Sequence, residues 1–304
     1  MKDEIYEIPG KAQLCYEKNK GLALPGKVPY IGMGSSYFAP MVFKYLGVNI
    51  YPELASEFFN YGIQYPGLDK AVLISQSGKS SETLWCADKV ESFAGIMNDI
   101  NSPLGTHRNL SKTIELFAGE EDFSSTKTYI NTLIALYLGF GFNPGPAIEV
   151  ITRDFSLYET EGGKLGKKIL KFYGKGKCRG VYIIGNGPNT ATSQLAALVI
   201  SESTKIPVQG MAMAQYDHGV KETANGSFII AINPKGKASK RTSDLLKTVN
   251  KAGAVTFELN NFGVEEEFSP LVAPIPFFFA ANYIAAKLKV SAPFIVGGKV
   301  TTVT

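Results

Sequence analysis

A short run of hydroxyl and amide side chains, Ser75-Gln76-Ser77, directly follows the apolar residues 71–74. The apolar run predicts a buried strand, and residues 80–90 predict a helix that begins near Ser80. Serine hydroxyls, Gly78 and unpaired backbone N–H groups would then meet at a helix N-terminus, an arrangement that binds phosphate. The sequence therefore predicts a small phosphorylated ligand, and the alternative is an ordinary helix capped by serine.

Two familiar nucleotide motifs do not account for these glycines. The tripeptide Gly78-Lys79-Ser80 resembles the end of a P-loop, but Leu73 occupies the position of that motif's first glycine. The Gly-x-Gly pairs at 32–34 and 185–187 both lack the third glycine of the dinucleotide fingerprint. We therefore expect neither ATP nor NAD, and no cofactor of any kind.

Composition excludes several other classes of protein. The chain has 304 residues, 45% of them hydrophobic, which suffices for a substantial core and for two domains. The net charge is only +4, and the basic run at 164–179 is interpreted as a solvated helix end and linker. We expect no nucleic-acid partner.

Cysteine, histidine and hydropathy patterns indicate a cytoplasmic protein. Three widely spaced cysteines suit a reducing compartment, and with only two histidines they lack the spacing of a metal site, so no metal is expected. The first ten residues lack the apolar segment of a signal peptide. The most apolar stretch, 271–286, contains two prolines and predicts a buried helix, so no membrane partner is expected.

Internal repetition indicates the fold. Residues 30–37 and 182–190 share one pattern, a strand that ends in glycines and leads into a helix. Further apolar strands follow in both halves, at 72–75 and 93–97 and at 228–233 and 254–259. Strands that alternate with helices predict the α/β class, with two similar doubly wound parallel-sheet domains. The turn-rich stretch 139–146 separates them, so that we expect domains at 1–145 and 146–304.

The two polar loops of the first half would lie together. Gly34-Ser35-Ser36 and Ser75-Gln76-Ser77 both follow predicted strands. Ligands of open α/β sheets bind beyond the carboxyl ends of the strands. We therefore expect the two loops to line one pocket.

At these residues the chain resembles the sugar isomerase (SIS) family, and most closely the isomerase part of the glutamine–fructose-6-phosphate amidotransferases. The likeness covers nearly the whole chain and implies two SIS-type domains. Its motifs occur in the family's order: Glu4-Ile-Tyr-Glu7, Gly34-Ser-Ser-Tyr37, Ala55-Ser-Glu-Phe58, Ser75-Gln-Ser-Gly78, Ala118-Gly-Glu-Glu121 and Ser125-Thr-Lys127.

The resemblance implies roles for particular residues. By position, the side chains that hold the sugar phosphate are those of Ser35, Ser36, Ser75, Gln76, Ser77, Ser80 and Ser125. Glu202 matches the family's isomerisation base, His218 its ring-opening histidine, and Lys299 the lysine that forms a Schiff base with the open-chain ketose. The family also implies a homodimer in which the histidine serves the neighbour's site.

The chain also departs from the family's pattern. Leu195 and Val199 stand where the synthases carry a glutamate and a lysine, and Lys2 stands where a glutaminase would have its cysteine nucleophile. Without a glutaminase domain, the expected reaction is deamination of glucosamine 6-phosphate to fructose 6-phosphate and ammonia. The alternatives are a fructosamine-6-phosphate deglycase, another phosphosugar isomerase, a synthase subunit with a separate glutaminase, or a non-catalytic sugar-phosphate sensor.

Overall fold

A computed structural model describes residues 1–62, 69–174, 176 and 178–296. These residues fold into two compact units. The amino-terminal unit contains residues 10–121 and 127–145, and the carboxy-terminal unit contains residues 1–9, 122–126 and 146–295. One division thus falls between residues 145 and 146, and two short segments of the first half of the sequence group with the second half.

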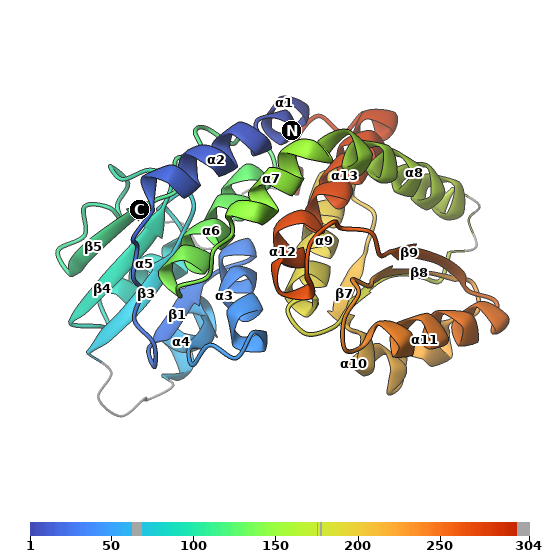
Figure 1. Ribbon diagram of the computed structural model, residues 1–304, viewed down its shortest axis with the longest axis horizontal. Helices are drawn as coiled ribbons and strands as arrows, with labels where there is room; N and C mark the ends of the chain where they lie inside the picture. Colours follow the sequence, from blue (N-terminus) through green and yellow to red (C-terminus); the bar gives the residue numbers. More distant parts are fainter. Residues whose placement is uncertain (63–68, 175, 177, 297–304) are drawn as a thin grey trace. The chain divides into compact units, whose positions relative to one another are not determined.

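The amino-terminal unit is built on a parallel sheet with the strand order β2-β1-β3-β4-β5 (Figure 1). Its strands are β1 (Pro29–Gly32), β2 (Tyr51–Leu54), β3 (Lys70–Ile74), β4 (Ser92–Met97) and β5 (Leu110–Glu115). Its helices are α2 (Ile8–Lys18), α3 (Ser35–Tyr45), α4 (Ala55–Tyr61), α5 (Ser81–Ala87) and α6 (Lys127–Gly139).

Helices cover both faces of this sheet, as the doubly wound fold requires. Ile31 and Leu73 pack with α4 and α5 in one apolar cluster. On the other face, the ring of Tyr30 lies 5.5 Å from that of Phe140, and α3 packs on α6. Strands buried on both faces explain why β1 and β3 are continuous apolar runs without alternation.

The carboxy-terminal unit repeats the plan with the strand order β7-β6-β8-β9, again parallel (Figure 1). Its strands are β6 (Gly180–Gly185), β7 (Gln209–Ala212), β8 (Ser227–Ile232) and β9 (Val255–Leu259). Its helices are α1 (Lys2–Tyr6), α7 (Gly145–Arg153), α8 (Phe155–Tyr173), α9 (Asn189–Thr204), α10 (Met213–Asp217), α11 (Ser239–Lys251), α12 (Ser269–Val272) and α13 (Pro274–Leu288), with short 3-10 helices at Val220–Thr223 and Glu266–Phe268.

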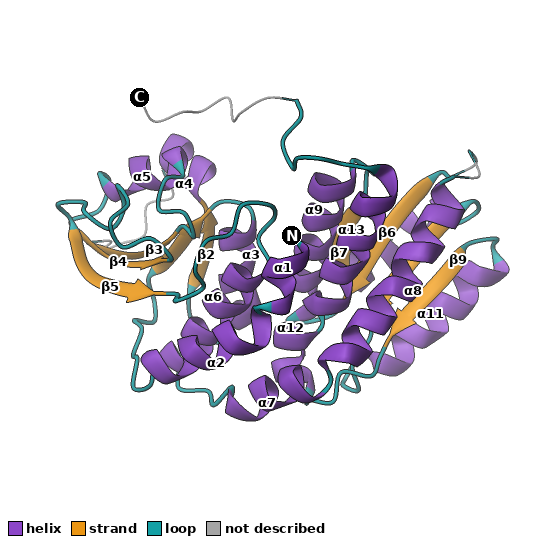
Figure 2. Ribbon diagram, turned by 90° about the horizontal axis from the view of Figure 1, so that it is seen from above, coloured by secondary structure: helices purple, strands orange, loops and turns teal. Residues whose placement is uncertain are grey.

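Two layers of helices enclose this second sheet as well. Ile229 and Ala231 of β8 pack with α10 and α11. Phe228 faces the opposite side, where its ring lies 5.5 Å from that of Phe172 in α8. Figure 2 shows α8 and α13 side by side, and they are in extensive contact. The predicted fold class, two similar doubly wound parallel-sheet domains, is confirmed.

The repeat noticed in the sequence corresponds to one structural device. Gly32 and Gly185 each end the first strand of a unit, and these strands lead into α3 and α9. A Cβ on Gly32 would lie 2.8 Å from the backbone of Ser36, and one on Gly185 would lie 2.2 Å from the carbonyl of Asn189. Only glycine lets the helix start so close to the strand.

The helices α7 and α8 meet at Asp154. One predicted element is divided in the structure. The apolar helix expected at 271–286 is broken at Ala273, where Pro274 begins α13, and its residues are largely buried as predicted. Among the described residues, the helical run Glu266–Leu288 is long and apolar enough to span a membrane, but 72% of its most apolar window is buried in the protein, as in a core helix.

Candidate functional site

The two polar loops of the amino-terminal unit are in contact. Gly32 of β1 lies in register with Ile74 of β3, so that the carboxyl ends of these neighbouring strands coincide. The residues that follow them meet there, and the Ser35 hydroxyl donates to Oε1 of Gln76 at 2.9 Å. Both loops therefore lie at one edge of the sheet.

The serine loop itself is held by its own backbone. Gly78 N–H donates to the Ser75 carbonyl at 3.0 Å, and Gly78 has a φ of +64°, which favours glycine. The Ser75 hydroxyl lies 3.2 Å from the Ser80 hydroxyl, whereas the Ser77 hydroxyl accepts from the N–H of Lys79 at 3.2 Å. Ser80 is the N-cap of α5. The loop thus gathers three hydroxyls around a tight turn.

Burial distinguishes the members of this group. Ser35, Ser36 and Ser75 are buried, whereas Ser77 is exposed. In the part of the chain that the structure describes, the buried Gln76 amide nitrogen has no hydrogen-bond partner. An unsatisfied buried donor is costly, and an acceptor supplied by a ligand would remove that cost.

Glu202 lies in the carboxy-terminal unit, in the last turn of α9. The Ser124 hydroxyl donates to its Oε2 atom at 3.1 Å, and Ser124 and Ser203 share a hydrogen bond of 2.9 Å. The ammonium group of Lys205 donates to the Glu202 carbonyl oxygen at 2.5 Å and also to the carbonyl of Pro293. The carboxylate is therefore half-buried in a polar setting.

His218 is exposed and follows α10, after the carboxyl end of β7. Glu202 precedes the amino end of β7, because α9 runs back along the sheet before residues 205–208 lead into that strand. Within one chain, Glu202 therefore lies at the amino ends of the strands of the second sheet and His218 at their carboxyl ends. Beside His218, hydrogen bonds from Lys221 and Arg241 lower the pKa of Asp217.

Ser125 and Lys299 are the remaining predicted site residues. Ser125 belongs to the segment 122–126 and thus to the same compact unit as Glu202, not to the unit of the serine loops. Lys299 lies outside the described residues. The roles of all ten predicted site residues stay predictions.

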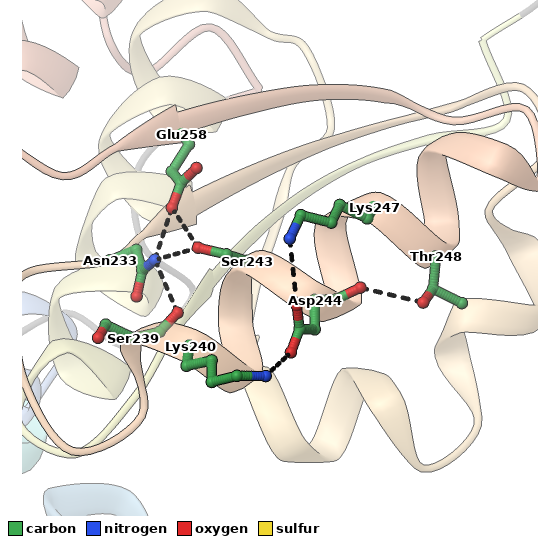
Figure 3. Close-up of polar contacts among 8 residues, drawn as sticks. All are labelled: Asn233, Ser239, Lys240, Ser243, Asp244, Lys247, Thr248 and Glu258. Carbon is green, nitrogen blue, oxygen red and sulfur yellow. Dashed lines mark hydrogen bonds and ion pairs between the residues drawn. The ribbon is translucent and has the colours of Figure 1, made fainter.

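The carboxy-terminal unit has a cavity of its own at the corresponding sheet edge. It measures about 620 Å³ and is lined by the ends of β8 and β9 and by α11. Figure 3 shows its polar groups paired with one another: Asn233 with Ser243 and Glu258, and Asp244 with two lysines. None of these residues was singled out from the sequence.

Ser124, which donates a hydrogen bond to Glu202, was not predicted from the sequence. It is adjacent to Ser125 in the motif that carries the family resemblance, and that adjacency was the only available signal. Its contact with Glu202 joins residues 78 positions apart, which no local pattern records.

Comparison with known proteins agrees with the resemblance. No family model matches the chain. It is 26% identical to a glutamine–fructose-6-phosphate aminotransferase (isomerizing) of Pyrococcus horikoshii over 94% of its length but 52% of the relative's. The chain thus spans about half the length of that curated relative.

Solved structures share the fold over whole chains. A glucosamine-6-phosphate deaminase from Thermotoga maritima superposes with a TM-score of 0.77 at 18% identity, covering 95% of this chain and 96% of the other. The C-terminal domain of a glucosamine-fructose-6-phosphate aminotransferase from Francisella tularensis gives 0.72 at 20% identity, with coverages of 94% and 95%. The resemblance seen in the sequence is confirmed: over nearly its whole length the chain is similar to the isomerase part of the glutamine–fructose-6-phosphate aminotransferases.

Proposed function

We propose that this protein is a phosphosugar isomerase-type enzyme that converts glucosamine 6-phosphate and water to fructose 6-phosphate and ammonia. The observation that carries the proposal is the cluster of the Ser35, Ser75 and Ser80 hydroxyls beside the Gln76 amide nitrogen, which has no hydrogen-bond partner among the described residues. Hydroxyl and amide donors fit a phosphate group, and the start of α3 adds favourable dipole interaction.

The carboxy-terminal unit supplies the proposed chemistry. Glu202 would move a proton between C1 and C2 of the open-chain sugar, and its half-buried, hydrogen-bonded carboxylate suits a general base. Lys299 would attack a ketose carbonyl or act electrostatically on its oxygen. His218 would open the ring, since imidazole exchanges protons near neutral pH.

The position of His218 supports the proposal of a homodimer. Glu202 lies at the amino ends of the strands of the second sheet, and His218 lies at their carboxyl ends. The two side chains of one chain therefore do not meet at the same end of this sheet. A histidine that serves the neighbour's site would remove this difficulty. Cross-complementation tests the idea: mixing inactive His218→Ala and Glu202→Gln proteins should restore up to about a quarter of the activity if the residues act across copies.

The names of the relatives support the choice of substrate. The relatives are named for fructose 6-phosphate, and one structural neighbour is named a glucosamine-6-phosphate deaminase.

Thermal protection together with ammonia release tests the function. Glucosamine 6-phosphate at a hundredfold its dissociation constant should stabilise the protein by about 2.7 kcal/mol, whereas glucosamine should not. Ammonia should appear only with the phosphorylated sugar. Equal protection by glucosamine would contradict the phosphate site, and protection without ammonia across a panel of amino-sugar phosphates would indicate a sensor.

A further inference from the structure

A buried pair of hydroxyls contacts the carboxylate proposed as the base. Ser124 is 2% exposed and Ser203 is fully buried. The Oγ atom of Ser124 lies 3.1 Å from Oε2 of Glu202 and 2.9 Å from Oγ of Ser203. Burial excludes water as a replacement partner of the two serine hydroxyls, whereas the Glu202 side chain is half-buried.

The number of protons determines the direction of both hydrogen bonds. A hydroxyl has one proton to donate, and an ionised carboxylate can only accept. Ser124 therefore donates to Glu202, and Ser203 must donate to Ser124. The two hydroxyls form a short chain of donors that ends on the carboxylate.

The segment that carries Ser124 is anchored at its other end. One oxygen of Glu4 accepts from the N–H groups of Asp122 at 2.7 Å and Phe123 at 3.3 Å, and the other pairs with the terminal ammonium of Met1 at 2.8 Å. The helix α1 that carries Glu4 is itself fixed, because Tyr6 packs edge-on against the rings of Phe155 and Phe279. Ser124 thus approaches Glu202 from a fixed backbone.

We propose that Ser124 is a positioning residue that holds the Glu202 carboxylate ionised and correctly oriented for proton transfer. The inference rests on the proposed function. A donor that bonds to the charged form favours that form, and a base needs a fixed orientation as well as a free lone pair. Charged groups in these contacts include the Lys205 ammonium, which donates to the Glu202 carbonyl oxygen, and the Glu4 carboxylate, which accepts from the N–H of Asp122. Glu202 also has further interactions.

A titration observed by NMR tests the contact directly. In protein labelled with ¹³C at glutamate side chains, the carboxyl signal of Glu202 is identified by its loss in Glu202→Gln. Ser124→Ala should raise the pKa of Glu202, since a hydrogen bond to the ionised form is lost. Ser124→Thr keeps the hydroxyl and should restore the original value. An unchanged pKa in Ser124→Ala would overturn the proposal.

Kinetics then separate this inference from the proposed function. Ser124→Ala should lower kcat about tenfold with little change in KM, and Ser124→Thr should recover most of it. If Glu202→Gln stayed active, the proposed base would be wrong, while the titration would still decide whether Ser124 holds that carboxylate. Should Ser124→Ala fail to fold, Ser124→Cys keeps most of the volume with a much weaker donor and should show the same direction of shift. A shift in the opposite direction, or none, would overturn the proposal there too.

Discussion

The loops that follow the central strands of the two units occupy equivalent places and hold different polar groups. After β3 the sequence is Ser-Gln-Ser-Gly-Lys-Ser-Ser (75–81), and after β8 it is Asn-Pro-Lys-Gly-Lys-Ala-Ser (233–239). Both keep Gly-Lys at the fourth and fifth positions, and both lead into a helix. The hydroxyls at the first, third and sixth positions of the amino-terminal loop are absent from the other.

Polar groups of the carboxy-terminal loop, residues 233–239, form hydrogen bonds with other residues of the same unit. Asn233 is buried, and its amide nitrogen donates to the Ser239 carbonyl at 3.1 Å, the Ser243 hydroxyl at 3.2 Å and the Glu258 carboxylate at 2.5 Å (Figure 3). At the glycine, a carboxylate oxygen of Glu266 accepts from the N–H of Lys237 at 3.3 Å. An acidic side chain thus sits on the backbone where an anion would bind.

Among the described residues of the amino-terminal loop, the Gln76 amide nitrogen is buried without a partner, whereas the amide nitrogen of Asn233, the first residue of the other loop, has three acceptors. The same strand-turn-helix arrangement can therefore leave hydrogen-bonding groups available for a ligand, or its own side chains can occupy them. The comparison indicates that the fold provides the frame, and the side chains at the sheet edge determine whether it binds.

The largest effect is expected from replacing Glu202, the proposed base, which should change turnover and leave binding in place. Glu202→Gln should lower kcat on the order of 10² to 10⁴-fold, because an amide cannot accept the C2 proton. Binding of glucosamine 6-phosphate, measured by calorimetry, should stay within about twofold of the wild-type protein, since the amide keeps the shape. Retained turnover would mean that another carboxylate is the base.

Alanine at the two loop glycines should have unequal effects. Gly78 has a φ of +64°, and a Cβ there would lie 1.8 Å from the hydroxyl oxygen of buried Ser102. Gly78→Ala should therefore lower the free energy of unfolding by about 3 kcal/mol and weaken ligand binding with it. At Gly236 a Cβ would meet the end of the Glu266 side chain at 2.3 Å, and that end can move. Gly236→Ala should cost less than about 1 kcal/mol in denaturant unfolding, and equal losses at the two glycines would contradict the comparison.

Features that depend on local sequence patterns could be predicted, whereas contacts between residues far apart in the chain could not. Apolar runs next to glycines located β1, β3, β6 and β8 and revealed the repeat, because each signal lies within about ten residues. The short strands β2 and β7 lack such runs and were not predicted. Ser124, Glu4 and Glu266 act through partners far away in the chain, and no spacing predicts which carboxylate will reach which backbone N–H.

Removing the first residue of each loop should separate binding from stability. Asn233→Ala removes three hydrogen bonds and leaves the half-buried Glu258 carboxylate with one donor fewer, so the free energy of unfolding should fall by about 2 kcal/mol with ligand affinity unchanged. The matched variant Ser75→Ala should weaken glucosamine 6-phosphate binding about tenfold, or about 1.4 kcal/mol, with less than about 1 kcal/mol lost in stability. Chemical denaturation and calorimetry on both proteins measure the two quantities. A loss of affinity in Asn233→Ala comparable to that in Ser75→Ala would remove the distinction between the loops.

The smallest effect concerns the carboxylate that closes the second loop. Glu266→Ala would release the N–H of Lys237 and the space at Gly236, leaving a turn with basic side chains and free amide groups. Inorganic phosphate should then bind with a dissociation constant on the order of 1 to 10 mM, which corresponds to about 3 to 4 kcal/mol. Amide shifts of Gly236 and Lys237 during a phosphate titration would report it, and the free energy of unfolding should change by less than about 1 kcal/mol because the hydrogen bond that is lost is exposed. Glu267→Ala is the control, since it removes the same charge one residue away from Glu266. If phosphate perturbed both variants alike, the effect would be one of net charge, and the second loop would not be a closed counterpart of the first.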